Sequence, residues 1–282
     1  MSHARSIRLR RLVVSAVAAA GLVFAGSVAG PAQAAPLPPP PSIAALGDSI
    51  SQAMDACGYR NCPTYSWSTG SVSTINSHAS RIRAKGVPGL LVYNDSASTS
   101  KAVNLLAQAQ LAVTQNPAYV TVQIGANDAC TTTVAGMTAP DVFRAQVKAA
   151  LDVLSAQAPN AQVFVASIPN VKRLYDLNKS KSGARLVWAA ARICQSMLAY
   201  PTSTKTVDVQ RRDAVQARVN AFNDALAAEC QARANCTWDG YAVANFAFTS
   251  SHISILDYFH PSISGQAKLS EITWPLTPYG RP

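Results

Sequence analysis

The chain has 282 residues, of which 49% are hydrophobic and 13% are charged, and its formal net charge is +10. A chain of this length can bury a sizeable apolar core within one domain. It contains no run of lysine and arginine and no basic stripe interleaved with aromatic residues, so nothing in the sequence supports binding to nucleic acid.

The first 34 residues have the pattern of an export signal. Four arginines precede an apolar stretch of small residues from position 12 to about 29, and Ala32-Gln33-Ala34 is an A-x-A cleavage site. A membrane anchor is the alternative, but a stretch rich in alanine and glycine that ends in a cleavage site disfavours retention in lipid. We therefore expect residues 1–34 to be a signal peptide and the protein to be secreted. The arginine pair at positions 10 and 11 leaves open whether the general or the twin-arginine route is used.

Removal of this segment takes away four arginines and no acidic residue, which lowers the formal charge from +10 to +6. A modestly basic chain of this kind suits contact with anionic cell-envelope surfaces. A proline-rich run follows the cleavage site, and such a run favours an extended segment over packed structure. We expect residues 35–41 to be a linker and residues 42–282 to form one domain, since no internal repeat or second composition regime is present.

From residue 42 onward, short β-branched apolar runs alternate with longer stretches of helical periodicity. This alternation predicts a mostly parallel central sheet covered by helices, that is, a three-layer α/β/α fold. In chain order, the predicted strands are Ile43 to Leu46, Leu90 to Tyr93, Tyr119 to Ile124 and Gln162 to Ile168. The predicted helices are Ala102 to Thr114, Asp141 to Gln157, Ala184 to Leu198 and Val209 to Arg233.

The chain has six cysteines, and in an exported protein this number most often means three disulfides. Six cysteines allow fifteen pairings, and spacing alone does not settle the choice between them. A zinc site is the competing interpretation, but it fails because the chain has no C-x-x-C pair and no histidine at ligand spacing from a cysteine. Spacing favours the pairs Cys57 with Cys62, Cys130 with Cys194, and Cys230 with Cys236.

The segment Gly47-Asp48-Ser49 directly follows the first predicted strand. A glycine lets the chain turn sharply there without a Cβ clash, and the serine hydroxyl would then project from the edge of the sheet. In open α/β sheets the reacting groups lie at this edge, the carboxyl ends of the strands. The alternative is that Asp48 or Ser49 only caps a helix, and a lone G-D-S is a weak signal.

His260 is one of only three histidines that follow the export signal, and Asp257 stands three residues before it. In a turn or a helix start, the aspartate can accept a hydrogen bond from one imidazole nitrogen while the other nitrogen faces a serine. A nucleophile, a base and an orienting carboxylate are the groups that acyl transfer to water requires. The alternative is a surface turn with a capped histidine. That interpretation is favoured for a D-x-x-H segment by itself, but the catalytic interpretation is favoured when the segment is considered together with Ser49.

The segment Gly125-Ala126-Asn127-Asp128 follows the third predicted strand, at the same edge of the sheet. The side-chain amide of Asn127 can donate a hydrogen bond to a developing oxyanion, and loss of one such donor typically costs about 10²–10³ in kcat. The alternative is a turn-forming Asn-Asp pair, which is slightly favoured when this segment is taken by itself.

Through the G-D-S at 47–49, the G-A-N-D at 125–128 and the D-x-x-H-P at 257–261, the chain resembles the GDSL family, also called SGNH hydrolases. It most resembles the secreted actinobacterial lipase-like members, over essentially all of the chain from residue 42 to the C-terminus. The resemblance implies the flavodoxin-like SGNH hydrolase fold, with Ser49 as the nucleophile, His260 as the base and Asp257 as the carboxylate that orients the base. It also implies that no metal or other cofactor is required.

The resemblance further implies three oxyanion donors, which are the backbone N–H of Ser49, the side chain of Asn127 and a backbone N–H after the second strand. The family usually has glycine at the third position, whereas here the family interval falls on Thr99. A threonine keeps the N–H, but its branched side chain restricts close approach and disfavours positive φ, which would reduce activity or alter the substrate range. The nearest glycine is Gly70, which lies too early in the chain for the family order.

The sequence therefore predicts a secreted, monomeric serine hydrolase that cleaves a small-molecule or lipid ester, with lipid-like esters as the first choice. A disulfide from Cys130 to Cys194 would fasten the loop of Asn127 and help to preorganise that donor. Two rivals stay open, because fold alone does not select the substrate. One is a carbohydrate deacetylase of the same fold, and the other is a secreted binding protein that has lost turnover through the departure at Thr99.

Overall fold

The computed structural model describes Met1 and residues 37–280. The export signal expected over residues 1–34 lies outside the described residues, and so do the first two residues of the expected linker. Residues 37–41, the rest of that linker, contain no helix or strand, because prolines lack the N–H that either element needs. The first strand begins at Ser42.

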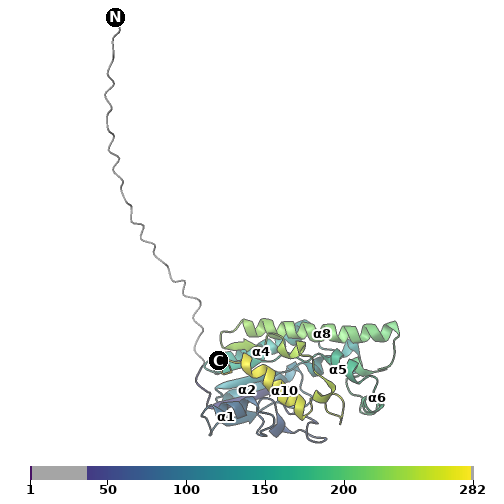
Figure 1. Ribbon diagram of the computed structural model, residues 1–282, viewed down its shortest axis with the longest axis horizontal. Coiled ribbons are helices and arrows are strands. Elements are labelled where there is room, and N and C mark those ends of the chain that lie inside the picture. The colour runs from purple at the N-terminus through teal and green to yellow at the C-terminus, as the bar shows by residue number, and fades with distance from the viewer. Residues whose placement is uncertain (2–36, 281–282) are drawn as a thin grey trace. The chain divides into compact units, whose positions relative to one another are not determined.

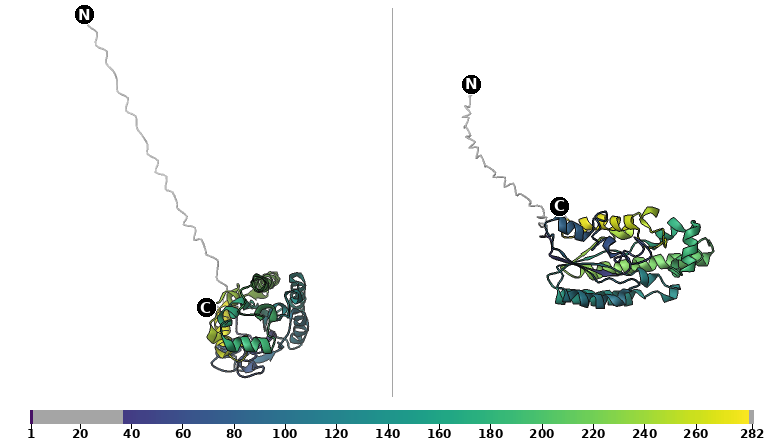
Figure 2. Two further views of the ribbon diagram at one scale, coloured as in Figure 1. Left: turned by 90° about the vertical axis from the view of Figure 1, so that its right-hand side faces the viewer. Right: turned by 90° about the horizontal axis from the view of Figure 1, so that it is seen from below.

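The described chain forms a central sheet of five parallel strands in the order β2-β1-β3-β4-β5. Their bounds are β1 Ser42–Gly47, β2 Leu91–Asn94, β3 Tyr119–Gln123, β4 Gln162–Val165 and β5 Cys236–Trp238. This is the order of flavodoxin-like sheets, in which the winding reverses between β1 and β3. Helices lie on both sides of the sheet (Figures 1 and 2), so the predicted three-layer fold is confirmed.

Alternate strand residues point to opposite faces of the sheet, and each face therefore has its own core. On one face, Val122 and Val165 pack in a cluster with apolar residues of α2 (Ala102–Thr114), α4 (Pro140–Gln157) and α8 (Thr206–Gln231). The helix α2 has the bounds that its periodicity predicts. The α4 and α8 helices lie within three residues of their predicted bounds, so helical periodicity was a sufficient guide on this face.

The second face has a separate and more aromatic core. Ile43, Tyr119 and Phe164 of the strands belong to a cluster that includes residues of α1 (His78–Ala84) and α10 (Ile263–Thr273). The two helices that cover this face come from opposite ends of the domain. Closing this face brings Leu269 of the C-terminal helix α10 into the same cluster as Ile43 of β1.

The other described helices are short. They are α3 Ala126–Ala129, α5 Val171–Asn178, α6 Ser182–Ala190, α7 Gln195–Leu198 and α9 Ala242–Asn245, with 3-10 turns at Pro63–Tyr65, Val134–Gly136, Ser250–His252 and Trp274–Leu276. The single helix predicted over Ala184 to Leu198 is wrong, because α6 and α7 replace it. Between them Arg192 and Cys194 have φ values of 50° and 42°, in the left-handed region that interrupts a helix.

Three disulfides join the six cysteines in the pairs that spacing favours. They link Cys57 with Cys62, Cys130 with Cys194, and Cys230 with Cys236. The last of these lies at the start of β5, a strand that the sequence analysis did not predict because three residues are too few for a periodic signal. Among the helices that the structure describes, none combines the length and the apolar character needed to cross a membrane.

Candidate active site

The turn after β1 places Ser49 at the carboxyl end of the sheet. Gly47 ends the strand with a φ of 139°, and a Cβ at this position would lie 2.0 Å from the carbonyl oxygen of Gln123 in β3. Only glycine fits there, since both the dihedral angle and the close approach of the strand exclude a side chain. Ser49 is 7% exposed, so its hydroxyl is sheltered but borders the pocket described below.

Two buried glutamines hold this turn from opposite layers of the fold. The Oε1 of Gln108 in α2 accepts from the Gly47 N–H at 2.7 Å, and its Nε2 donates to the Gly47 carbonyl at 2.9 Å. From α10, Gln266 donates to the carbonyl of Ile50 at 2.8 Å. Neither glutamine was predicted to support the site. The sequence contained one signal for this role, which is a glutamine on the apolar face of a predicted helix. A buried amide there needs hydrogen-bond partners.

A row of hydrogen bonds joins the two ends of the chain at this turn. The Nε2 of His260 lies 2.8 Å from the Ser49 Oγ, and the two residues are 211 positions apart in the sequence. The Nδ1 of His260 lies 2.5 Å from the Asp257 Oδ2. This places the three predicted triad residues together, with the imidazole between the hydroxyl and the carboxylate.

The loop between the 3-10 turn Ser250–His252 and α10 fixes the orientation of this aspartate and histidine. An antiparallel bridge pairs Ile253 with Pro261, and the Ser254 N–H donates to the carbonyl of His260 at 2.8 Å. Within the loop, the Asp257 Oδ1 accepts backbone N–H groups of residues 259 and 260 at 2.9 and 3.0 Å. Both carboxylate oxygens are therefore engaged, one by the backbone and one by the imidazole.

Asp257, in this row, and Asp48, in the turn after β1, differ in their protonation. Burial alone would raise the pKa of Asp257, but the hydrogen bond and charge of His260, with the two backbone donors, hold that pKa below its usual value. Burial raises the pKa of Asp48 to about 7, although its Oδ1 accepts the Ile50 N–H at 2.9 Å. The carboxylate that faces the imidazole is therefore ionised at neutral pH, whereas the carboxyl of the G-D-S turn is not fully ionised.

Asn127 lies in α3, directly after β3. Its Nδ2 donates to the carbonyl of Ser100 at 2.9 Å, which ties it to the loop after β2. The hydroxyl of Ser100 in turn accepts from the Gln108 Nε2 at 3.1 Å. The amide of Asn127 has a second N–H, so one donor can hold the loop while the other stays available to a substrate oxygen.

The structure also shows what is special about Thr99. Its φ is 70°, in the left-handed region that favours glycine, so the threonine adopts the backbone that its branched side chain disfavours. In the described part of the chain, neither the Thr99 N–H nor the Ser49 N–H donates to another group. Both are thus available to an oxyanion. The alternative donor Gly70 is not available, because its N–H donates to the Ser66 carbonyl at 2.9 Å.

Asp128 organises the loops around Asn127, although no role in the site was predicted for it. Its buried carboxylate accepts the Ala102 N–H at the start of α2 at 2.9 Å and the Thr138 hydroxyl at 2.7 Å. Burial raises its pKa, and these two hydrogen bonds act in the opposite direction. The carboxylate therefore joins α3 to the N-terminus of α2, where a negative charge is favourable.

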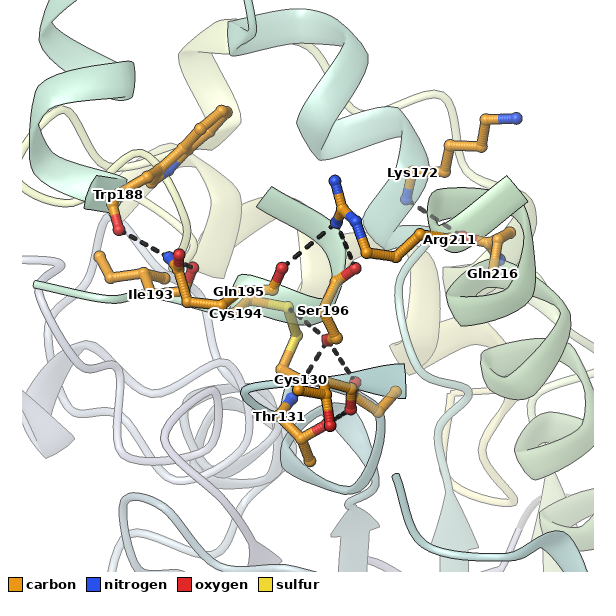
Figure 3. Close-up of a disulfide and its surroundings, with 12 residues drawn as sticks. Cys130, Thr131, Lys172, Trp188, Ile193, Cys194, Gln195, Ser196, Arg211 and Gln216 are labelled. Atoms are coloured by element: carbon orange, nitrogen blue, oxygen red, sulfur yellow. Dashed lines mark hydrogen bonds between the residues drawn. A yellow bond between two sulfur atoms is a disulfide. The ribbon is translucent and has the colours of Figure 1, made fainter. Parts of the chain in front are cut away.

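A disulfide and several hydrogen bonds fasten the C-terminal end of α3 (Figure 3). Cys130 follows α3 and is bonded to Cys194, at the start of α7. Next to it, the Ser196 hydroxyl donates to the Ala129 carbonyl at 2.8 Å, and the Ser196 N–H donates to the Thr131 carbonyl at 2.7 Å. The segment after Asn127 is thus held against α7, as expected for a preorganised donor.

An apolar pocket borders Ser49 and His260. Leu174 and Leu177 of α5 line it, and Phe248 lines it from the segment that leads to the triad loop. Ser49 and Ala126, the residue before Asn127, line it, whereas Thr99 and Asn127 do not. A pocket with this lining suits the hydrocarbon part of a substrate. It was not predicted, because its residues come from segments far apart in the sequence.

One group of side chains in the described residues has the spacing of a metal site. Asp55, Asp257 and His260 each offer a ligand atom, and these atoms lie within 4.8 Å of one another. Both ring nitrogens of His260 already have hydrogen-bond partners, so a metal would have to displace one of them. The residues present fit a proton-transfer role better, and the expectation that no cofactor is required stays a prediction.

The site contains a hydroxyl, an imidazole and a carboxylate in one hydrogen-bonded row. It lies at the switch point of a flavodoxin-like sheet, and this arrangement defines the serine hydrolase class. A family model described as GDSL-like Lipase/Acylhydrolase matches residues 43–273. The chain therefore belongs to this family, as its three motifs indicate. Family membership supports ester hydrolysis as the reaction.

Several solved structures have the same fold and match most of this chain, and two of them are LAE5 and an extracellular lipase. LAE5, an α/β hydrolase enzyme from the metagenome of Lake Arreo, Spain, matches with a TM-score of 0.54 and 15% identity, over 86% of this chain and 96% of its own. The extracellular lipase from Streptomyces rimosus matches with a TM-score of 0.51 and 19% identity, over 84% of this chain and 99% of its own. These identities are low, so the matches show the fold alone. Comparison with curated proteins found no match.

Proposed function

We propose that the chain is a secreted serine esterase that hydrolyses lipid-like carboxylic esters through an acyl-enzyme on Ser49. The observation that carries this proposal is the hydrogen-bonded row of Asp257, His260 and Ser49, with distances of 2.5 and 2.8 Å. Membership of a lipase and acylhydrolase family supports the same reaction. The apolar pocket beside the serine supports the lipid-like substrate.

In the first half of the proposed reaction, the Ser49 Oγ attacks the ester carbonyl carbon, and its proton passes to the Nε2 of His260. The π electrons of the carbonyl move to its oxygen, which becomes the oxyanion of a tetrahedral intermediate. Asp257 stabilises the imidazolium that results and keeps the Nδ1 proton in place. When the oxyanion re-forms the carbonyl, the bond to the alcohol breaks, and the alcohol oxygen takes the proton from Nε2.

In the second half, water replaces the alcohol. His260 removes a proton from the water, whose oxygen attacks the acyl carbon and forms a second oxyanion. Collapse of this intermediate breaks the bond to the Ser49 Oγ, which regains its proton from the imidazolium, and the carboxylic acid leaves. Each half returns the base to its neutral state, so no external proton carrier is required.

The proposed oxyanion donors are the N–H groups of Ser49 and Thr99 and the side chain of Asn127. Their support is that the two backbone groups have no partner among the described residues and that the asparagine is tied to the same loop as the threonine. Donors that are already oriented cost no reorganisation when charge develops on the oxygen. Ser49 supplies one of these donors and also borders the pocket, so the substrate oxygen and its hydrocarbon chain can be bound at the same time.

Hydrolysis of p-nitrophenyl esters from acetate to palmitate tests this function. We expect the parent protein to prefer medium or long acyl chains, and Ser49→Ala to lower kcat by at least about 10⁴. A fluorophosphonate should label the parent and leave Ser49→Ala unlabelled. Ser51→Ala is the matched control, because its hydroxyl is buried two residues away and hydrogen bonds to no described group.

Three outcomes would contradict parts of this proposal. Equal hydrolysis by parent and Ser49→Ala would exclude the nucleophile. Hydrolysis of acetate esters and acetylated polysaccharides, with no turnover of longer chains, would replace the lipid-like substrate with a carbohydrate ester. A folded parent protein that hydrolyses no ester and takes up no fluorophosphonate would be a binding protein with the fold of an esterase.

We also propose that the protein is exported, with cleavage after Ala34, and acts as a monomer that contacts anionic envelope surfaces. The three disulfides support export, because such bonds persist mainly outside the reducing cytosol. N-terminal sequencing of protein from the culture medium should begin at Ala35. Light scattering tests the monomer, and co-sedimentation with anionic vesicles at low and high salt tests the surface contact.

A further inference from the structure

A second carboxyl group lies beside the triad and has no place in the mechanism above. The carboxyl of Asp55, the carboxyl of Asp257 and the ring of His260 have atoms within 4.8 Å of one another. Asp55 and Asp257 are only 6% and 5% exposed, so water screens the two carboxyls weakly. Asp55 follows Ser49 by six residues, and the same loop therefore carries the nucleophile and this extra carboxyl.

The backbone of Asp55 is fastened to both loops of the site. Its N–H donates to the carbonyl of Arg60 at 3.0 Å, and its carbonyl accepts from the Ser254 hydroxyl at 2.7 Å, three residues before Asp257. Its φ is 56°, a left-handed value that aspartate and asparagine tolerate better than most residues. The disulfide from Cys57 to Cys62 closes the loop just beyond. The carboxyl position is thus set by the backbone.

Although the backbone of Asp55 is held by hydrogen bonds, its side chain has few hydrogen-bond donors around it. In the described part of the chain, its Oδ1 accepts no hydrogen bond. A buried carboxylate without donors next to another carboxylate is unfavourable, and sharing one proton between the two relieves the repulsion. In accord with this, burial and then the charge of Asp257 raise the pKa of Asp55 to about 6, while His260 acts in the opposite direction.

We propose that Asp55 is a positioning residue of the triad, which acts on His260 through Asp257 in a way that depends on its own protonation. As a carboxylic acid, its O–H donates to Asp257 and takes up part of the negative charge that the imidazole needs. As a carboxylate, it adds a second negative charge that stabilises the imidazolium formed during attack. Asp55 itself touches neither the substrate nor the reacting atoms. This inference rests on the proposed serine esterase function.

Few titratable groups compete with this interaction. In the described residues, those that act on the Asp55 carboxyl are Asp257 and His260, both from the triad loop. Asp48 also interacts electrostatically with His260, from the turn after β1. Arg60 lies on the same loop as Asp55 but is exposed. A change at Asp55 should therefore reach the imidazole directly, and Asp48 is the acid outside the triad that is seen to interact with His260 from another element.

The pH dependence of kcat/KM for Asp55→Asn tests the proposal. Asparagine tolerates the φ of 56° and can still donate to Asp257, but it cannot ionise. We expect the acid limb of the profile to move down by about 0.5–1 pH unit, because the imidazolium loses a nearby negative charge. The limb should also become less steep, since one fewer proton is released, and kcat at pH 8 should fall about 3–10-fold with little change in KM.

Two further variants separate this role from a structural one. Asp55→Gly also tolerates the left-handed backbone and should move the acid limb in the same direction. Asp95→Asn is the matched control, because burial raises the pKa of Asp95 as well, but that residue is not among the groups that act on the triad. A fall in kcat with an unchanged acid limb in both Asp55 variants would assign Asp55 a structural role and overturn the proposal.

A measurement without turnover distinguishes this inference from the proposed function. In the Ser49→Ala background, the proton resonances of the His260 ring can be followed by NMR as the pH is changed. Adding Asp55→Asn should move that titration curve to lower pH by about 0.5–1 unit, whether or not the protein is an esterase. A curve that stays in place overturns the proposal. A shifted curve in a protein that hydrolyses no ester would overturn only the function.

Discussion

The carboxyl edge of β1 and β3 and the wall of the apolar pocket border the same serine but are built differently. At the edge, Gly47, Gln108 and Asp128 each have a defined hydrogen bond or a required φ, and a substitution would break it. Along the wall, Leu174 and Leu177 present only apolar side chains to the pocket. The comparison indicates that the edge fixes the chemistry, whereas the wall can change with the substrate.

The two regions also differ in charge. Four buried acids lie at the edge, and burial raises the pKa of three of them, Asp48, Asp55 and Asp128. The pocket lining has three basic side chains, Arg173, His252 and His260, and no acid, and the Nε of Arg173 donates to the Phe248 carbonyl at 2.6 Å. Substitutions at the edge should therefore alter kcat, stability and pH dependence. Substitutions in the wall should alter the choice of substrate.

The largest effect expected at the edge is that of Asp257→Asn. The amide cannot carry the negative charge that stabilises the imidazolium, and it no longer enforces the tautomer that leaves Nε2 free to accept a proton. We expect kcat to fall about 10⁴-fold for every acyl chain tested. Asp152→Asn on the exposed surface of α4 is the control. A loss below tenfold would show that another group orients His260.

Asn127→Ala should have the next largest effect. Loss of this donor should lower kcat about 10²–10³-fold and change KM by no more than a few fold. The reason is that the oxyanion forms in the transition state and the tetrahedral intermediate and is absent from the bound substrate. Single-turnover kinetics with acetate and octanoate esters should show the same ratio for both substrates. A loss confined to the longer ester would instead place Asn127 in substrate binding.

Asp48→Asn should make the folded protein more stable at alkaline pH. The pKa of Asp48 is about 7 in the folded chain and 3.8 in the reference state, so the folded state holds its proton more tightly and ionisation destabilises it as pH rises. Asparagine keeps the acceptor for the Ile50 N–H but cannot ionise. We expect urea unfolding to show a gain of about 2–4 kcal/mol at pH 8 and less than about 1 kcal/mol at pH 4.

Leu174→Trp tests the pocket wall. The larger ring should fill the pocket and lower kcat/KM for long-chain esters about tenfold, while acetate hydrolysis changes little. Leu186→Trp is the matched control, because Leu186 lies on α6, is 71% exposed and does not line the pocket. An equal loss for acetate and palmitate would show that the wall supports the catalytic edge rather than the acyl chain.

Removal of the disulfide between Cys130 and Cys194 should have the smallest effect on activity. The double alanine variant should lower kcat a few fold, and more than it raises KM, because the loop of Asn127 loses one of its fastenings. The bond closes a 64-residue separation, so its loss should also cost about 4 kcal/mol of stability. The matched control removes the Cys230 to Cys236 bond and should leave kcat unchanged. Equal kcat in variant and parent would remove the preorganising role.

Local patterns predicted a large part of this molecule. Helix α2 was predicted with its observed ends because its apolar residues recur at helical spacing. The meeting of Ser49 and His260 followed from three short motifs at family spacing, and the structure places the two side chains 2.8 Å apart. The first prediction depends on spacing within one helix, and the second depends on motifs that are each only a few residues long.

The features that were missed depend on distant contacts. The break between α6 and α7 follows from the left-handed backbone of Arg192 and Cys194, next to a disulfide that no periodicity reveals. The support of Gly47 by Gln108 spans 61 residues, and the Asp55 carboxyl reaches the triad only when the two loops are folded together. Single-sequence patterns cannot report such contacts, because nothing in the local spacing distinguishes them from ordinary turns and helix faces.

The separation of 211 positions between Ser49 and His260 has a consequence for the synthesis of the protein. A ribosome makes the serine early, and the sheet can begin to form around it while the chain is still growing. The imidazole is made 211 positions later, so a chain that has not yet reached His260 carries a serine without this base. The hydroxyl and its base are thus paired only after both ends of the domain have been made.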